Sequence, residues 1–179
     1  TGNSSLPGAN LFYTFYEDNK SEITFLASEL TANGLQIGSQ LDEIGWEISS
    51  ASGQAMNNLS IDIDQSGNVT NVYSGTYTAV TGWNTFTFVS PLVWNGGDIK
   101  VITCFDNLNW TSANNFYYTT TSFASVQRSF SDLGPGNLCS NPTTSTSFDR
   151  PNTRFGTNNS LYAYSWSNGS TTQNISGLS

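Results

Sequence analysis

The stretch LSIDID, residues 59–64, alternates apolar and polar side chains without a fault, and the turn sequence QSGN, residues 65–68, follows it directly. Strict alternation is typical of a β-strand with one buried face, here the face that carries the leucine and the two isoleucines. Ser, Gly and Asn favour a tight turn, and residues 69–78 supply the next strand or two. The stretch therefore predicts antiparallel strands that bury one face against a core.

Strand signals of the same kind recur on both sides of this stretch. Residues 98–105 are mostly apolar and are expected to lie in the centre of a sheet. Residues 28–34 indicate one helical turn stopped by Gly34, and no longer amphipathic helix is recognised. About ten short strands separated by turns predict an all-β fold, an antiparallel β-sandwich with jelly-roll connectivity. The other expected strands are residues 11–16, 23–27, 41–49, 85–89 ended by Pro91, 116–119, 125–130 and 152–155.

Charge and composition disfavour two classes of partner. Charged residues make up only 10% of the chain, while Ser, Thr, Asn and Gly are abundant, which favours strands and turns over exposed helices. The formal net charge is −8, so the surface repels nucleic-acid phosphates and anionic lipid. No apolar run is long enough for membrane insertion and no signal peptide is recognised, so we expect a mature or internal fragment of an exported protein.

The two cysteines, Cys104 and Cys139, allow two interpretations. A polar, lysine-poor surface favours an extracellular location, where a disulfide between them would persist. Closing that loop would stabilise the fold by about 4 kcal/mol. Two buried free thiols are the alternative.

A change in composition near the C-terminus indicates a domain boundary. The segment GTNNS, residues 156–160, has the composition of a linker, and residues 161–166 begin a fresh strand pattern. We therefore expect one β-sandwich domain over residues 1–156, followed by a linker and the start of another module over residues 157–179. The alternative is that residues 161–166 complete the first domain as a C-terminal strand.

Residues 164–178, YSWSNGSTTQNISGL, resemble the opening of the SprB-type repeat. Such repeats are small Ig-like β modules, strung in long arrays in the giant adhesins of gliding bacteria of the Bacteroidota. The later strands of the repeat are absent from this sequence, so the repeat is incomplete. The match is carried by Trp166, Gly169, Thr172, Ile175 and Leu178.

Residues 1–156 are similar to a β-sandwich domain that is common in large secreted proteins of the same bacteria. The resemblance implies display on the surface of a Gram-negative cell and export by type IX secretion, and it favours a Cys104–Cys139 bridge. It brings no catalytic residues. The matching pieces are residues 28–30, 82–86, 104–107, 117–120 and 150–155.

The sequence lacks the groups on which most enzymes depend. Without histidine there is no Ser-His-Asp triad and no His-ligated zinc, and no Gly-rich loop followed by lysine cradles a phosphate. Glu43 and Glu47 share one strand face but lie about 13 Å apart by strand rise, too far for a glycosidase pair. Arg150 and Arg154 are expected to pair with nearby carboxylates. We expect no enzymatic activity and no required cofactor.

Structural calcium is the one ion that the sequence leaves open. Asp62, Asp64 and Ser66 have the alternating spacing of the first half of a calcium loop, with a glycine at the bend. The twelfth position is Tyr73 and not glutamate, so an ordinary β-turn is the alternative. Asp106 begins a second oxygen-rich loop, for which capped turns are the alternative.

Trp110 is the tryptophan best placed to bind a ligand, because its loop neighbours are polar. A tryptophan on such a loop can stack on a sugar face, and the alternative is that it folds over the edge of the sandwich. Asn107 and Asn109 precede it in the loop, and Tyr118 lies in one of the matching pieces. These four residues are the candidate ligand-binding group.

Taken together, these features predict a non-catalytic module of a large secreted cell-surface adhesin, acting in gliding or surface attachment. The expected partners are a surface polysaccharide or another extracellular surface, and neighbouring repeat modules of the same chain. The alternatives are an ancillary carbohydrate-binding module of a secreted hydrolase and a ligand-free structural spacer. Neighbouring domains separate them, because further repeats indicate an adhesin and a catalytic domain indicates an enzyme accessory.

Overall fold

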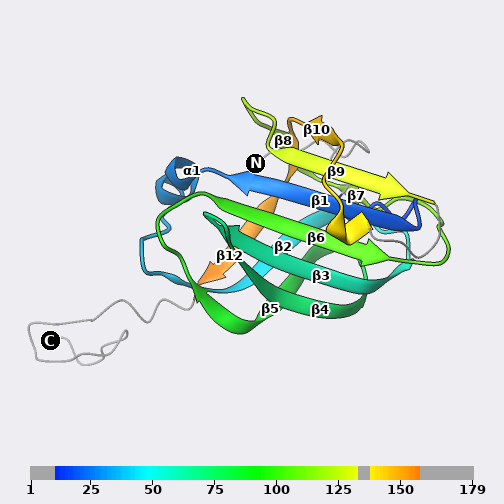
Figure 1. Ribbon diagram of the computed structural model, residues 1–179, viewed down its shortest axis with the longest axis horizontal. Coiled ribbons are helices and arrows are strands. Elements are labelled where there is room, and N and C mark those ends of the chain that lie inside the picture. The colour runs from blue at the N-terminus through cyan, green and yellow to red at the C-terminus, as the bar shows by residue number, and fades with distance from the viewer. Residues whose placement is uncertain (1–10, 133–137, 158–179) are drawn as a thin grey trace, which may run out of the picture.

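Two antiparallel sheets enclose the apolar core in the computed structural model, which describes residues 11–132 and 138–157. The larger sheet has six strands, and β6 lies in its interior, as expected for residues 98–105. Figure 1 shows this sheet in front, with β2 and β12 of the smaller sheet behind it. Across the larger sheet the strands are β10 (Ser145–Ser147), β9 (Val126–Ser131), β1 (Asp18–Phe25), β6 (Ile99–Asp106), β3 (Ala55–Gln65) and β4 (Asn68–Thr78).

The smaller sheet is built around β2 (Gln40–Ser50), which pairs with β5 (Gly82–Val93) on one side. On its other side, β12 (Thr153–Thr157) pairs with one part of β2 and β7 (Asn115–Phe116) with another. β8 (Tyr118–Thr120), which follows β7 in the chain, pairs with β11 (Asp149–Pro151), which precedes β12. The pairs are nested along the chain, β3–β6 inside β2–β7 inside β1–β9, as in a jelly roll. The all-β sandwich is thus confirmed.

The burial of alternate side chains predicted for residues 59–64 is confirmed. Leu59, Ile61 and Ile63 are fully buried on β3, while Asp62 and Asp64 lie on the opposite, partly exposed face. Apolar side chains of both sheets fill the space between them and supply the main favourable term in folding. This core also contains Ile23 of β1, Ile44, Trp46 and Ile48 of β2, Phe86 of β5, and Val101 of β6.

The short helix α1 (Ala27–Ala32) stops where the sequence predicts. Gly34 adopts a φ of 93°, which glycine tolerates without strain, and its N–H donates to Thr31 O. Leu35 N–H donates to Leu30 O, so both bonds satisfy carbonyls at the end of the helix. The helix therefore ends against the core and leads the chain into β2.

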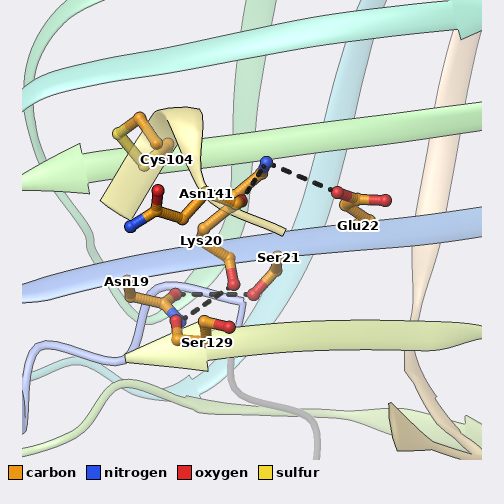
Figure 2. Close-up of a disulfide and its surroundings, with 8 residues drawn as sticks. Asn19, Lys20, Ser21, Glu22, Cys104, Ser129 and Asn141 are labelled. Atoms are coloured by element: carbon orange, nitrogen blue, oxygen red, sulfur yellow. Dashed lines mark hydrogen bonds and ion pairs between the residues drawn. A yellow bond between two sulfur atoms is a disulfide. The ribbon is translucent and has the colours of Figure 1, made fainter. Parts of the chain in front are cut away.

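The Cys104–Cys139 disulfide is present. Cys104 lies on β6, opposite Lys20 of β1, and the bridge fixes a short 3₁₀ helix, Leu138–Ser140, to this face of the larger sheet. In Figure 2 the ammonium of Lys20 donates to Asn141 O at 2.8 Å and also pairs with Glu22. Cys139 and Asn141 are thus held on this face by a covalent and a polar contact together.

Residues 11–16 differ from the prediction, because they form turns and not a strand. Thr14 N–H donates to Phe12 O and Tyr16 N–H donates to Tyr13 O, and both bonds fold the chain back on itself. The side chains of this apolar run divide between the core and the surface. Leu11 and Phe12 enter the core, whereas the later aromatic residues reach the surface.

The ends of several strands also differ from the prediction. β5 continues through Pro91 to Val93, because it is an edge strand of its sheet and its register with β2 shifts beside the proline. β10 and β11, three residues each, give no sequence signal and were not predicted. β12 includes Gly156 and Thr157, the first two residues of the stretch with linker composition, and so runs one residue past the predicted boundary. Residues 158–179, with the rest of the linker and the repeat-like segment, lie outside the described residues.

Candidate functional site

Five aromatic side chains from three separate segments meet on the surface at one end of the sandwich. Their ring centroids form a connected set: Trp110 lies 5.5 Å from Phe15, Phe15 lies 5.6 Å from Tyr16, and Tyr16 stacks on Phe130 at 4.2 Å. Trp110 is 54% exposed, Phe15 45% and Phe130 38%. We call this group, completed by Tyr13, the ring surface: Tyr13, Phe15, Tyr16, Trp110 and Phe130.

The ring surface is anchored in the core through Phe12. Its ring lies at 5.5–5.9 Å, centroid to centroid, from three buried aromatic rings, those of Trp46, Phe86 and Phe116. Because Phe12 is fixed, the next turn of chain can only project Tyr13 and the following rings outward. Such edge-to-face packing favours a defined geometry over a mobile loop.

Buried polar side chains tie the turn at residues 11–16 to the loop that carries Trp110. Thr14 Oγ1 donates to Ser112 O at 2.7 Å, and Thr111 N–H donates to Thr14 O. Asn114, fully buried, donates to Phe12 O and accepts from Ser52 N–H. Unpaired, these groups would be costly to bury, so the network fixes the two loops against each other.

The four predicted ligand-binding residues occupy different environments. Trp110 and Asn109 are exposed in the loop at residues 107–114. Asn107 is buried, donating to Ala55 O and accepting from Asn57 N–H, so its amide supports the start of β3. Tyr118 is half-buried on β8, which pairs with β11 and not with the Trp110 loop. That these residues bind a ligand stays a prediction, and Trp110 and Asn109 are the two of the four that are exposed.

An acidic pair lies at the strand ends near the ring surface. Asp18 and Asp106 are direct partners in the β1–β6 register, and Asp18 is only 2% exposed. Burial first, then hydrogen bonding to and repulsion by Asp106, raises the pKa of Asp18 to about 7. Glu17 adds further repulsion, while Asp132 accepts from Glu17 N–H at the surface. This end of the molecule is therefore acidic as well as aromatic.

The calcium candidates on β3 are engaged in the β3–β4 hairpin. Ser66 and Gly67 have φ values of 58° and 91°, the backbone of a type I′ turn, and Asp64 accepts from Gly67 N–H at 2.6 Å. Asp62 accepts from the Asn71 amide at 2.8 Å. Within residues 11–132 and 138–157 there is no group of three or more acidic or Cys side chains arranged to hold a metal. Calcium binding stays a prediction for Asp62, Asp64, Ser66 and Asp106.

Away from the ring surface, a cleft of about 770 Å³ is lined by residues of α1, β2, β5 and the β11–β12 segment, together with Phe25 of β1. On one wall Arg150 makes a bidentate pair with Glu29, both bonds 2.9 Å, over the ring of Phe25. The pairing predicted for Arg150 is thereby confirmed, and hydrogen bonding from Arg150 holds the pKa of Glu29 below its usual value. We call this hollow the Trp83 cleft, after its exposed indole, which is 41% exposed.

Arg154 does not have the partner expected of it. Its guanidinium lies 4.6 Å from the centroid of the Trp83 ring and donates to Thr85 Oγ1. Among the described residues, no salt bridge reaches Arg154 or Glu47, the two charges beside Trp83. Guanidinium groups stack favourably on indole faces, which explains the arrangement without a carboxylate.

Neither aromatic site follows from the sequence patterns used above, although one signal was available. The run LFYTFY, residues 11–16, places bulky rings at adjacent as well as alternate positions. A half-buried strand can hide only every second side chain, so such a run must expose some of its rings. Phe130 and Trp83, by contrast, look like ordinary strand residues in the sequence.

Comparison with known proteins adds no relative: no family model, no curated protein and no solved structure matches this chain. The resemblances quoted above rest on the residues that carry them. Within the described residues, no helix has the length and apolar character needed to cross a membrane.

Proposed function

We propose that this chain is a non-catalytic attachment module of a large secreted adhesin, and that its ring surface binds polysaccharide at the cell exterior. The observation that carries the proposal is the exposed, connected group of aromatic rings around Trp110, held by a buried polar network and not left to a mobile loop. Scattered exposed aromatics need no explanation, whereas a connected group of this kind indicates an interaction site.

Pyranose rings have an apolar face and polar rims, and the ring surface offers a match to both. Indole and phenyl rings supply the stacking area, while Asn109 and the phenols of Tyr13 and Tyr16 supply polar groups around it. The neighbouring carboxylates and a net charge of −8 disfavour phosphate-rich partners. A neutral glycan fits this combination better than nucleic acid or an anionic lipid surface.

Three features support attachment without turnover. The sequence contains no histidine. Among the described residues, Asp18 is the one carboxylic acid with a strongly raised pKa, and it is buried and not presented to solvent. In the Trp83 cleft, the bidentate Arg150 favours the ionised form of Glu29, which opposes a role as proton donor.

The placement in an extracellular adhesin draws on two further observations. A disulfide persists most readily in an oxidising compartment, so the Cys104–Cys139 bridge agrees with export. The SprB-like segment at residues 164–178 supports a chain of modules that serves gliding or surface adhesion, with type IX secretion as its export route. In such a chain each module needs only weak affinity, because many copies raise the effective concentration.

Affinity electrophoresis through gels that contain single polysaccharides tests this function. The protein should bind at least one of them with a Kd on the order of 0.1–1 mM. Trp110→Ala should strongly reduce the retardation without lowering the melting temperature, since the indole is half exposed. Val89→Ala, an exposed apolar residue on β5 outside both aromatic sites, is the matched control and should bind normally. Undiminished binding by Trp110→Ala would remove the ring surface as the site.

An ancillary carbohydrate-binding module of a secreted hydrolase is the second candidate. The Trp83 cleft favours it, because a cleft of this volume lies in the range of small-ligand sites, roughly 300–1,000 Å³. The sequences that flank the chain in its parent protein distinguish the candidates. A catalytic domain next to it would favour the hydrolase, and a run of further repeats the adhesin. A ligand-free spacer would show no binding by either aromatic site.

A further inference from the structure

The strand register places three side chains of the Trp83 cleft on one face of the smaller sheet. On β2, Ile44, Trp46 and Ile48 point into the core, so Gly45 and Glu47 face outward. Glu47 lies opposite Trp83 of β5, while Gly45 lies between Thr85 of β5 and Arg154 of β12. Trp83, Glu47 and Arg154 therefore share the outer face of three adjacent strands.

The absence of a side chain at Gly45 is what lets Arg154 reach the indole. A Cβ at this position would stand 3.1 Å from Arg154 Nε and 3.2 Å from Thr85 Oγ1, tighter than normal packing. With glycine there, the Arg154 side chain crosses β2 and its guanidinium lies over Trp83. The stack fixes both side chains in an arrangement that needs no ligand to form.

The opposite wall of the cleft is equally fixed. Arg150 is bound by Glu29 and by Thr24 O, and it lies 4.6 Å from the centroid of the Phe25 ring. The backbone next to it is also hydrogen-bonded: Asn152 N–H donates to Tyr117 O, and Tyr117 N–H donates to Glu47 O. A preformed wall lowers the entropy lost when a ligand binds.

Charge in the cleft is balanced, unlike the rest of the chain. Two of the five cationic residues of the sequence line it, Arg150 and Arg154, together with the carboxylates Glu29 and Glu47. Glu29 and Arg150 neutralise each other. Glu47 and the N–H groups of Arg154 that do not bond Thr85 can therefore bind hydroxyl groups. An anionic ligand gains Arg154 but meets Glu47, so a neutral polyhydroxylated ligand is favoured.

We infer that the Trp83 cleft is a second glycan-binding site, in which the face of Trp83 that Arg154 does not cover stacks on a neutral pyranose ring while Glu47 and Arg154 bind its hydroxyl groups. The site is built on strands and shares no residue with the ring surface. It would let one module contact two sugar chains, or two parts of one chain. Such bivalence raises avidity without any new contact at either site.

The test follows the indole N–H signals of ¹⁵N-labelled protein during titration with neutral hexasaccharides: cellohexaose, xylohexaose, laminarihexaose, mannohexaose and chitohexaose. Each tryptophan has its own signal, and Trp83→Ala and Trp110→Ala assign two of them. At up to about 10 mM sugar, at least one hexasaccharide should shift the Trp83 signal. Glu47→Gln should weaken that binding about tenfold. In Trp83→Ala, which has no Trp83 signal, the sugar should no longer shift the backbone amide signals of the cleft residues. Val89→Ala should change nothing.

The outcomes separate this inference from the proposed function. A shift of Trp110 without Trp83 would overturn the cleft site and leave the ring surface intact. A shift of Trp83 without Trp110 would do the reverse, and no shift of either would overturn both. Hexagalacturonate serves as the acidic probe, and binding of this sugar alone would contradict the neutral ligand class. Gly45→Ala should displace Arg154 and weaken the cleft binding by a smaller factor than Trp83→Ala.

Discussion

The ring surface and the Trp83 cleft both expose tryptophan, but they hold it in different ways. Trp110 stands on a loop, and buried amide and hydroxyl groups of Asn114 and Thr14 keep that loop in place. Trp83 stands on an edge strand, and its neighbours follow from the register of β2 with β5 and β12. The difference teaches how each ring is held in position. A ring on a loop is held by buried hydrogen bonds that fix the loop, whereas a ring on a sheet face is held by the strand register, with a glycine leaving room for its neighbour.

The largest effect on the ring-surface end should come from removing the disulfide. Cys104→Ser with Cys139→Ser should lower the free energy of unfolding by about 3–4 kcal/mol, because the reduced chain regains the freedom of a long loop. Chemical denaturation measures the loss. The bridge holds Leu138–Ser140 against β6, the strand that leads into the Trp110 loop, so glycan binding at the ring surface should weaken more than binding in the cleft. A loss below about 1 kcal/mol would contradict the structural role of the bridge.

Asn114→Ala tests the buried hydrogen bonds that hold the Trp110 loop, and Asn33→Ala provides the comparison in the cleft. The variant removes a buried amide that bonds Phe12 O and Ser52 N–H, so unfolding should become easier by about 2–3 kcal/mol. Asn33→Ala, in the cleft, removes one exposed bond to Glu29 O and should cost less than about 1 kcal/mol. Thermal melts of both variants provide the measurement. Equal losses would mean that the loop network does not hold the ring surface.

At the ring-surface end, Asp18 should make folding stability fall as the pH rises. Its folded pKa is raised to about 7 from 3.8, so the folded state holds a proton that the unfolded state releases. This contribution to stability is complete near pH 4, falls as the pH rises towards 7, and is absent above it. Asp18→Asn should therefore flatten the fall in melting temperature between pH 4 and 8. An unchanged slope would show that Asp18 is already ionised in the folded protein.

The cleft should respond to pH with the opposite sign and a smaller amplitude. Arg150 lowers the folded pKa of Glu29 below 4.5, so the pair stabilises the fold above that value and its contribution is lost as the pH falls. Glu29→Gln should reduce the melting temperature at pH 7 and bring the two proteins together at acid pH. Asp98→Asn provides a control for general effects of removing a carboxylate nearby. A constant difference down to pH 2 would contradict the ion pair as the cause.

Much of the fold could be predicted from the sequence, because alternation is a local signal. Residues 59–64, the central strand at 98–105 and the stop at Gly34 all agree with the structure. The candidate sites were harder, because they join distant segments. Trp110 was recognisable from its polar neighbours. Phe15 lies beside it only in the folded protein, and Phe130 stacks on Tyr16 only after β1 and β9 pair.

Two further features lay beyond local reasoning. The position of Arg154 over Trp83 depends on the register of three strands and on Gly45 between them, and no spacing in the sequence reveals that register. Asn107 looked like a binding residue because it lies in a polar loop. The structure shows its amide bonding the backbone at the start of β3.

The central claim is that the molecule binds glycans through its exposed rings and does not cleave them. Saturation-transfer NMR on the protein with each hexasaccharide measures both in one tube, because binding transfers saturation to the sugar and cleavage creates new anomeric signals. We predict transfer that Trp110→Ala strongly reduces, with the anomeric signals unchanged over days. New anomeric signals that grow with time and protein concentration would contradict the account, as would full transfer in the Trp110→Ala variant.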